Sequence, residues 1–534
     1  MSDAWFDGLP ESWVKATLGE LTAPGIKQAP PEGGDQFLYV DISSVDNRAK
    51  RIAEPRLLPA SRAPSRAKQH LHASDVLVSM TRPNLNAVAM LPREMEGAIG
   101  STGFHVLRAV GIHPGWLLYL VQTDVFVQSM SLLVQGALYP AIRPKDISRF
   151  VVPLAPLAEQ DRIIVEIEKQ LTRLEAAEGA LKRLVTNLKR YRAAVLKAAC
   201  EGRLVPTEAE LARAERRDCE SADQLIADLL KERRAKWEAD QFAAMQATGR
   251  SQRDRNWRAR YKPPARPDTS DLPRAPDGWA WASVEELTAA NGGMTTGPFG
   301  TLIGKSDQRA TGVPVVGIPN ITNKGFVEGN WHCVAPEKAR QLRKYALLPG
   351  DLVVSRSGTV GQICLFPDLR GPAVMSTNLM RLRTVTVGQV NLGQWLVMNF
   401  KGSPTIQRQL EQLCKGSTRP FLNLEILSRL LIRLAPVGEC ERISQEVERR
   451  LSVIDELEAT LEANLKRAAR LRQGILKRAF EGRLVPQDPN DEPASVLLEG
   501  IRRERAAKAA DGQRPGRQRG AQNIMKSRGS RKRR

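Results

Sequence analysis

Two long stretches of the chain carry apolar residues at alternating three- and four-residue steps, the pattern of a coiled-coil seam. The first seam consists of Ile164, Ile167, Leu171, Leu174, Leu181, Val185, Leu188 and Val195. The second consists of Val447, Leu451, Ile454, Leu461, Leu465, Ala468 and Ile475. Each stretch predicts a helix of about 42 residues, which is roughly 60 Å at 1.5 Å per residue. Gly202 and Gly482, each followed four residues later by Pro, predict the helix ends.

These two stretches are copies of one another. Residues 154–206 and 434–486 align at a constant offset of 280, with 22 of 53 positions identical, and both end in EGRLVP. A weaker match joins residues 9–23 to residues 275–289, with 7 of 15 identical at an offset of 266. The chain is therefore expected to hold two diverged copies of one unit, the second with net insertions in its loops.

Polar residues interrupt both seams at equivalent positions. Glu178 and Arg192 interrupt the first, and Glu458 and Arg472 interrupt the second. If the helices pack antiparallel, Glu178 faces Arg472 and Arg192 faces Glu458, and such pairs can fix register and orientation. The alternative is that these long side chains extend to solvent. Glu159 and Glu439, near the helix starts, suit the helix dipole.

The remaining parts of each copy have short apolar runs separated by Gly, Pro and Asn turns, which predicts mixed α+β domains. The expected fold is two domains of similar mixed α/β architecture joined by two long helices in an antiparallel coiled coil, a pseudo-twofold internal repeat. The expected divisions are domains at 1–153 and 276–433, helical regions at 154–245 and 434–511, a basic Pro/Arg-rich linker at 246–275, and a basic disordered tail at 512–534.

Charge narrows the choice of partner. The chain has 80 Lys+Arg and 59 Asp+Glu, a net charge of +21, which favours a polyanionic partner, either nucleic acid or an anionic membrane surface. Residues 502–534 hold 13 Lys+Arg and 2 Asp+Glu, so this end alone supplies +11 and is expected to bind phosphate nonspecifically. No apolar run reaches the ~18 residues of a membrane helix, and no signal peptide is recognisable, so a cytoplasmic protein is expected.

Known catalytic patterns are missing from the sequence. It contains no phosphate loop, HExxH, GxSxG elbow or Cys-x-x-Cys pair, so no catalytic or metal-binding residue is assigned. Asp75 and Asp351, which precede apolar runs, are read as turn caps rather than catalytic carboxylates. His70 and His72 lack a visible third ligand.

At this point a family resemblance becomes specific. Two divergent globular domains, each followed by a similar long helix ending in EGRLVP, resemble the specificity subunit of a type I restriction–modification system. PLAEQDRII (156–164) is similar to the family's helix start, and LVPQDPNDEPASVLLEGIRRERA (484–506) to its C-terminal segment. GPFGTLIGKSD (297–307) and GDLVVSRSGTVG (350–361) resemble parts of its target-recognition domains.

The resemblance implies a non-catalytic subunit that reads an asymmetric bipartite DNA site, one half with each target-recognition domain. It implies two methyltransferase subunits and two restriction subunits as partners. It also implies that this subunit binds no cofactor, while the complex uses S-adenosylmethionine, ATP and Mg²⁺.

Polar and basic residues on loops after the strands are the candidates for DNA contact, because such side chains bind base edges and phosphates. In the first domain they are Thr81, Arg82, Asn84, Asn86, Ser101, Thr102, Tyr139 and Arg143. In the second they are Lys305, Arg356, Ser357, Thr359, Ser376, Thr377, Asn378, Lys415, Thr418 and Arg419, with Phe299 beside Lys305.

Two other classes of protein fit part of this pattern. A stand-alone nucleic-acid-binding protein would bind specifically without enzyme partners. A coiled-coil adaptor would lose its DNA affinity with residues 512–534, whereas a specificity subunit would keep its sequence preference.

Overall fold

The computed structural model describes residues 6–31, 36–134, 140–247, 256–386, 392–414 and 421–512. The chain divides into two units. Unit 1 comprises Met1–Leu181 and Glu462–Arg534, and unit 2 comprises Lys182–Leu461. Each unit therefore contains one domain, one half of the first long helix and one half of the second. The tail beyond Gly512 lies outside the described residues.

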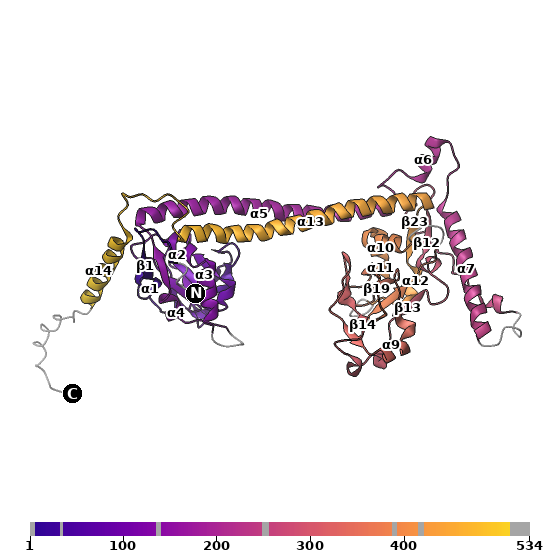
Figure 1. The fold of residues 1–534 in the computed structure, drawn as a ribbon, viewed down its shortest axis with the longest axis horizontal. Helices are drawn as coiled ribbons and strands as arrows, with labels where there is room; N and C mark the ends of the chain where they lie inside the picture. Colours follow the sequence, from indigo (N-terminus) through magenta and orange to yellow (C-terminus); the bar gives the residue numbers. More distant parts are fainter. Residues whose placement is uncertain are drawn as a thin grey trace, which may run out of the picture. The chain divides into compact units, whose positions relative to one another are not determined.

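The two long helices form as the seams predict. They are α5 (Leu157–Cys200) and α13 (Val437–Phe480), each of 44 residues, and within each unit their segments run side by side in opposite directions (Figure 1). Seam residues such as Ile167 and Ile454 are almost completely buried. Gly202 and Gly482 follow the helices with φ of 67° and 70°, the left-handed conformation that terminates a helix.

The polar seam residues pair across the helices. Arg192 lies 3.6 Å from Glu458, as predicted, and also contacts Asp455 at 2.5 Å. Arg472 contacts Glu175 at 2.5 Å, one helical turn before the Glu178 that the sequence suggested. Because Arg192 and Arg472 differ by 280, as do Glu175 and Asp455, the shorter contact repeats in both units.

The domain of unit 1 is built on small sheets. One has the order β5-β2-β9-β6, a second the order β10-β7-β8, and two-stranded sheets join β3 to β4 and β1 to β11. The strands are β1 (Val14–Thr17), β2 (Phe37–Val40), β3 (Val45–Asp46), β4 (Arg51–Ile52), β5 (Arg56–Leu58), β6 (Ala67–His70), β7 (Val76–Ser79), β8 (Val88–Met90), β9 (Ile99–Ser101), β10 (Phe104–Leu107) and β11 (Val151–Leu154). The shorter helices are α1 (Leu18–Leu21), α2 (Pro114–Leu120), α3 (Asp124–Leu132), α4 (Pro144–Ser148) and α14 (Ala494–Gly512).

Unit 2 repeats this order with additions. Its sheets run β17-β14-β21-β18 and β13-β22-β19-β20, with the pairs β15-β16 and β12-β23. The strands are β12 (Ala280–Ser283), β13 (Met294–Thr296), β14 (Val313–Val316), β15 (Ile321–Thr322), β16 (Gly325–Phe326), β17 (His332–Val334), β18 (Ala346–Leu347), β19 (Leu352–Ser355), β20 (Ile363–Leu365), β21 (Ala373–Met375), β22 (Leu379–Leu382) and β23 (Leu431–Leu434). The shorter helices are α6 (Glu208–Glu215), α7 (Ala222–Ala247), α8 (Val284–Leu287), α9 (Pro336–Gln341), α10 (Leu392–Gly402), α11 (Pro404–Leu413) and α12 (Leu424–Arg429).

The segment that holds β13 accounts for most of the changing sequence offset, which is 266 between β1 and β12 (280 − 14) and 276 between β2 and β14 (313 − 37). Strand β13 has no counterpart in the element order of unit 1, whereas helix α9 lies where unit 1 has the 3₁₀ helix Ala60–Arg62. In both units the first strand pairs antiparallel with the strand before the long helix, so the domain closes where that helix begins. This repeated mixed α/β order with two long helices confirms the predicted fold class.

Each copy of the repeated EGRLVP turn packs on the domain of its own unit. In unit 1 a Cβ at Gly482 would lie 2.4 Å from Pro10 Cγ, and in unit 2 a Cβ at Gly202 would lie 3.1 Å from Pro276 Cγ. The left-handed backbone and the close approach therefore both require glycine. The EGRLVP motif thus ends the helix and packs against a Pro-x-x-Trp segment of the domain.

The tryptophan of each Pro-x-x-Trp segment binds a buried glutamate. Trp13 Nε1 donates to Glu159 at 2.8 Å, and Trp279 Nε1 donates to Glu439 at 2.9 Å. Both glutamates are essentially inaccessible to solvent, and burial raises the pKa of each carboxyl above its usual range. The helix-dipole interpretation of these residues was therefore incomplete, since each joins a helix start to its domain.

Candidate nucleic-acid interface

In unit 1 three predicted loop segments meet at the end of β7. The Met80 amide donates to the Gly103 carbonyl at 3.0 Å, which brings in the turn that holds Ser101 and Thr102. The Ile142 amide donates to the Met80 carbonyl at 2.9 Å, and the Arg82 amide to the Pro140 carbonyl at 2.8 Å. Backbone hydrogen bonds thus gather segments that lie up to 62 residues apart in sequence (142 − 80).

The predicted residues of this cluster differ in exposure. Arg82, Asn84 and Arg143 are exposed, and Thr81 and Thr102 are partly buried. Arg82 has a φ of 49°, a left-handed conformation that a non-glycine residue adopts at some energetic cost. Tyr139 lies outside the described residues.

Two of the predicted residues hold the cluster together. Ser101 is only 4% exposed, and its Oγ accepts from the Gly103 amide at 3.2 Å. Asn86 has a φ of 46°, and its side-chain amide donates to the Val121 carbonyl at 2.9 Å. These contacts assign Ser101 and Asn86 to the frame of the loops.

Unit 2 forms the same kind of cluster after β19. The Ser355 hydroxyl donates to the Ser357 carbonyl at 3.0 Å, just as Ser79 donates to Thr81 at 3.0 Å in unit 1. The Arg356 amide donates to the Asn378 carbonyl at 3.0 Å, which joins the β19 loop to the turn of residues 376–378. The local backbone geometry is therefore repeated while the side chains differ.

Arg356 is buried beneath two aromatic rings. Its guanidinium carbon lies 5.5 Å from the centre of the Phe299 ring and 4.4 Å from that of Phe421. The residue is 6% exposed, its Nε has no hydrogen-bond partner among the described residues, and burial lowers its pKa. The rings themselves are 62% and 43% exposed, so the accessible surface here is aromatic rather than cationic.

The other candidates of unit 2 divide by position. Thr359 and Asn378 are exposed, and Ser357, Ser376 and Thr377 are partly buried within the cluster. Lys305 is exposed on the 3₁₀ turn Lys305–Asp307, and no contact among the described residues joins it to the cluster. Lys415, Thr418 and Arg419 lie outside the described residues.

A hairpin beside each loop cluster was not identified from the sequence. In unit 1 the β3–β4 hairpin carries Lys50, whose ammonium donates to the Asn86 carbonyl. Burial and the nearby Arg472 guanidinium lower the pKa of Lys50 to about 8. In unit 2 the β15–β16 hairpin carries Lys324, which forms an ion pair of 2.7 Å with Glu458 of α13. A short turn between two-residue strands has too weak a pattern to reveal these contacts.

Asp75 and Asp351, at equivalent positions of the two units, cap turns, as the sequence suggested. Asp75 accepts from the His72 amide at 2.8 Å, and Asp351 accepts from the Leu348 amide at 2.7 Å. Each is also held by an arginine, Asp75 by Arg108 at 2.7 Å and Asp351 by Arg383 at 2.7 Å. Both carboxylates are therefore engaged in structural hydrogen bonds and ion pairs. The described residues contain no group of three or more His, Cys, Asp or Glu arranged to hold a metal ion.

Within the described ranges, no helix has both the length and the apolar character needed to cross a bilayer.

Comparisons with known proteins agree with this architecture. No family model matches the chain. It is 23% identical over 367 residues to the type I restriction enzyme EcoBI specificity subunit of Escherichia coli, covering 67% of this chain and 65% of that protein. It is 22% identical over 524 residues to the EcoKI specificity subunit of E. coli strain K12, covering 93% and 97%.

Among solved structures, the chain matches one from a study of complex assembly and conformational transition in the type I R-M system. The TM-score is 0.63 at 22% identity, over 89% of this chain and 99% of that one. The fold is therefore shared over nearly the whole length.

Proposed function

We infer that this chain, which belongs to the type I restriction-enzyme specificity subunits, reads a bipartite DNA sequence with one half-site for each domain. The observation that carries this proposal is the repeated loop cluster after β7 and β19. The same backbone contacts present different side chains in the two units, Thr81 and Arg82 in one and Ser357 and Thr359 in the other. Two different readers on equivalent frames favour an asymmetric site.

We assign the two target-recognition domains to residues 1–153 and 276–433. The exposed residues Arg82, Asn84 and Arg143 are the candidates for base and phosphate contact in the first domain, because guanidinium and amide groups match base edges in the major groove. Thr359 and Asn378 take that role in the second domain. Arg356 acts through the exposed Phe299 and Phe421 rings that cover it.

The relatives are named as subunits of type I restriction enzymes, so we propose that this chain works in a complex. Its partners are two methyltransferase subunits and two restriction subunits. The complex uses S-adenosylmethionine, ATP and Mg²⁺, while this chain supplies recognition and no catalytic group.

The test is a map of adenine methylation in the host genome with and without the gene. A split, asymmetric motif that disappears on deletion supports the proposal and gives the target sequence. In the second arm, the purified chain is combined with a candidate methyltransferase subunit and tested for methylation of a defined motif. If the reconstituted pair methylates no defined motif while the chain alone selects a DNA sequence, the chain is a stand-alone binder and the proposal fails.

A further inference from the structure

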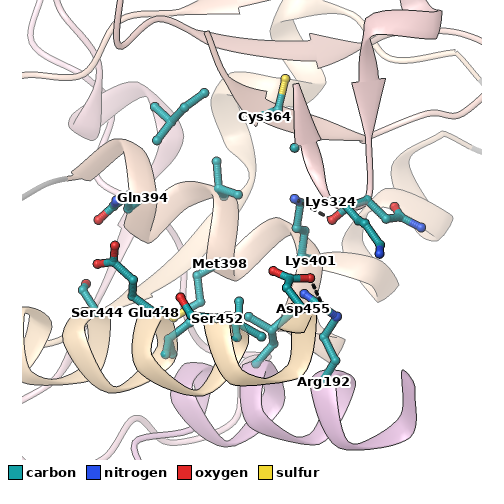
Figure 2. Close-up of a pocket in the computed structure, with 17 residues that line it drawn as sticks. Arg192, Lys324, Cys364, Gln394, Met398, Lys401, Ser444, Glu448, Ser452 and Asp455 are labelled. Carbon is teal, nitrogen blue, oxygen red and sulfur yellow. Dashed lines mark hydrogen bonds and ion pairs between the residues drawn. The ribbon is translucent and has the colours of Figure 1, made fainter. Parts of the chain in front are cut away.

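Two adjoining cavities lie between the long helices and the domain of unit 2. One has a volume of 490 Å³ and the other, drawn in Figure 2, a volume of 380 Å³. Arg192, Leu196, Asn323 and Lys401 line both cavities, so the two lie next to each other. Volumes of this size are in the range of ligand sites.

The larger cavity is lined by three cations and by no carboxylate. The cations are Lys189 and Arg192 of α5 and Lys401 of α10, and we call this space the cationic groove. Arg192 is neutralised by Asp455 at 2.5 Å. Neither Lys189 nor Lys401 has an ion-pair partner within the described residues, so the groove carries surplus positive charge, while Glu448 and Asp455 line only the adjoining smaller cavity.

Lys401 is the most constrained of these groups. Its ammonium donates to the Asn323 carbonyl at 2.9 Å, and Figure 2 shows this contact beside Lys324. Burial lowers its pKa, and the neighbouring Arg192 lowers it further. A partly buried ammonium among other cations is unfavourable unless an anion compensates it.

The groove is continuous with the recognition loop of this domain. Thr359, Gly361 and Gln362, which follow β19, form part of its wall. Gln362 also donates to Asn323 Oδ1 at 3.5 Å, so the loop and the β15–β16 hairpin meet there. Hydroxyl and amide side chains beside Lys and Arg are the groups that proteins use to bind DNA phosphates.

We propose that the cationic groove binds a backbone phosphate of the DNA next to the half-site read by domain 2, with Lys189 and Lys401 as the charged contacts. This inference rests on the proposed function. It adds a contact that carries no sequence information and fixes the position of the duplex against the long helices of unit 2.

The experiment uses the full-length chain and fluorescence anisotropy with duplexes that contain or lack the mapped motif. Lys189→Gln and Lys401→Gln are compared with Lys197→Gln, a matched charge removal on an exposed α5 position outside both cavities. Each groove variant should reduce the slope of log Kd against log salt by about 0.9 and weaken binding to both duplexes by the same factor. The Lys197 control should keep the wild-type slope. Lys189 is exposed, so its variant tests the idea even if Lys401→Gln folds poorly.

Wild-type slopes for both groove variants, with motif preference intact, would overturn the groove and leave the proposed function standing. If the wild-type chain shows no preference for the motif, both the groove proposal and the proposed function fail. Lysine methylation read by mass spectrometry identifies the source of the phosphate. Protection of Lys189 by duplex DNA supports the proposal, whereas protection by inorganic pyrophosphate but not by DNA rejects a DNA contact.

Discussion

Arg192 on α5 contacts Asp455 on α13 at 2.5 Å within unit 2. Adding 280 to Arg192 and subtracting it from Asp455 gives Arg472 and Glu175, which make the same 2.5 Å contact in unit 1. The duplication has therefore preserved an interhelical ion pair, with the arginine on the helix half that ends in EGRLVP each time. This repeat fixes the same register at two places along the helix pair.

A double-mutant cycle measures the value of this pair. Arg192→Ala and Asp455→Ala should couple by about 0.5 kcal/mol in urea unfolding, because Asp455 is half exposed and exposed ion pairs contribute roughly 0.2–1 kcal/mol. The Arg472 and Glu175 cycle should give a similar value. A control cycle of Lys197 with Asp455 should show no coupling energy. Equal coupling in the control cycle would mean that the Arg192–Asp455 pair does not fix the helix register.

The buried Glu439 makes stability depend on pH. Burial raises the pKa of this carboxyl in the folded state, while hydrogen bonds from the Glu208 amide and Trp279 lower it. The folded state therefore holds the proton more tightly than the unfolded state, and the resulting stability is lost as pH rises above the ordinary value near 4.5. Glu439→Gln should therefore lower the unfolding free energy by less at pH 8 than at pH 4.5, because the wild-type chain has by then lost the stability of the protonated carboxyl.

Trp279→Phe provides the matched comparison. It removes a donor to the carboxylate, so it should cost about 1–3 kcal/mol at neutral pH and less at acid pH. A pH-independent cost for both variants would show that folding does not raise the pKa of Glu439.

The two EGRLVP glycines should tolerate alanine unequally. Both have positive φ, which costs about 1–2 kcal/mol for a residue with a Cβ. The added methyl at Gly482 would meet Pro10 at 2.4 Å, whereas at Gly202 the nearest atom is at 3.1 Å. Gly482→Ala should therefore lower the unfolding free energy more than Gly202→Ala. Equal losses would mean that Pro10 moves aside.

Substitutions in one loop cluster should affect one half of the recognised motif. Arg82→Ala removes an exposed guanidinium from unit 1 and should relax or weaken recognition of one half-site by about 1–3 kcal/mol. Thr359→Ala should act only on the other half. Methylation mapping of each variant reads both halves at once, and changes in both halves from a single substitution would argue against independent readers.

Removal of residues 513–534 separates nonspecific from specific binding. This segment contains nine Lys+Arg and no Asp or Glu. Its loss should weaken binding to random DNA and flatten the salt dependence, because these charges contact phosphates alone. The preference for the mapped motif over random DNA should survive, and its disappearance would favour the adaptor interpretation.

The sequence by itself determined the duplicated plan. The seam of residues such as Ile167 and Ile454, the glycine stops and the repeated EGRLVP specified two long helices and two domains, because periodicity and helix-ending signals act locally. The turn-capping role of Asp75 and Asp351 was predictable for the same reason.

Only the tertiary structure decided which groups meet across the chain. Arg356 was predicted as an exposed DNA contact, but Phe299 and Phe421, which lie more than 50 residues from it on either side (356 − 299 = 57, 421 − 356 = 65), cover it. Lys401 and Lys189 were ordinary lysines in the sequence until folding placed them beside one cavity without a carboxylate. Burial and long-range pairing depend on how the elements pack, and no local pattern of residues records that.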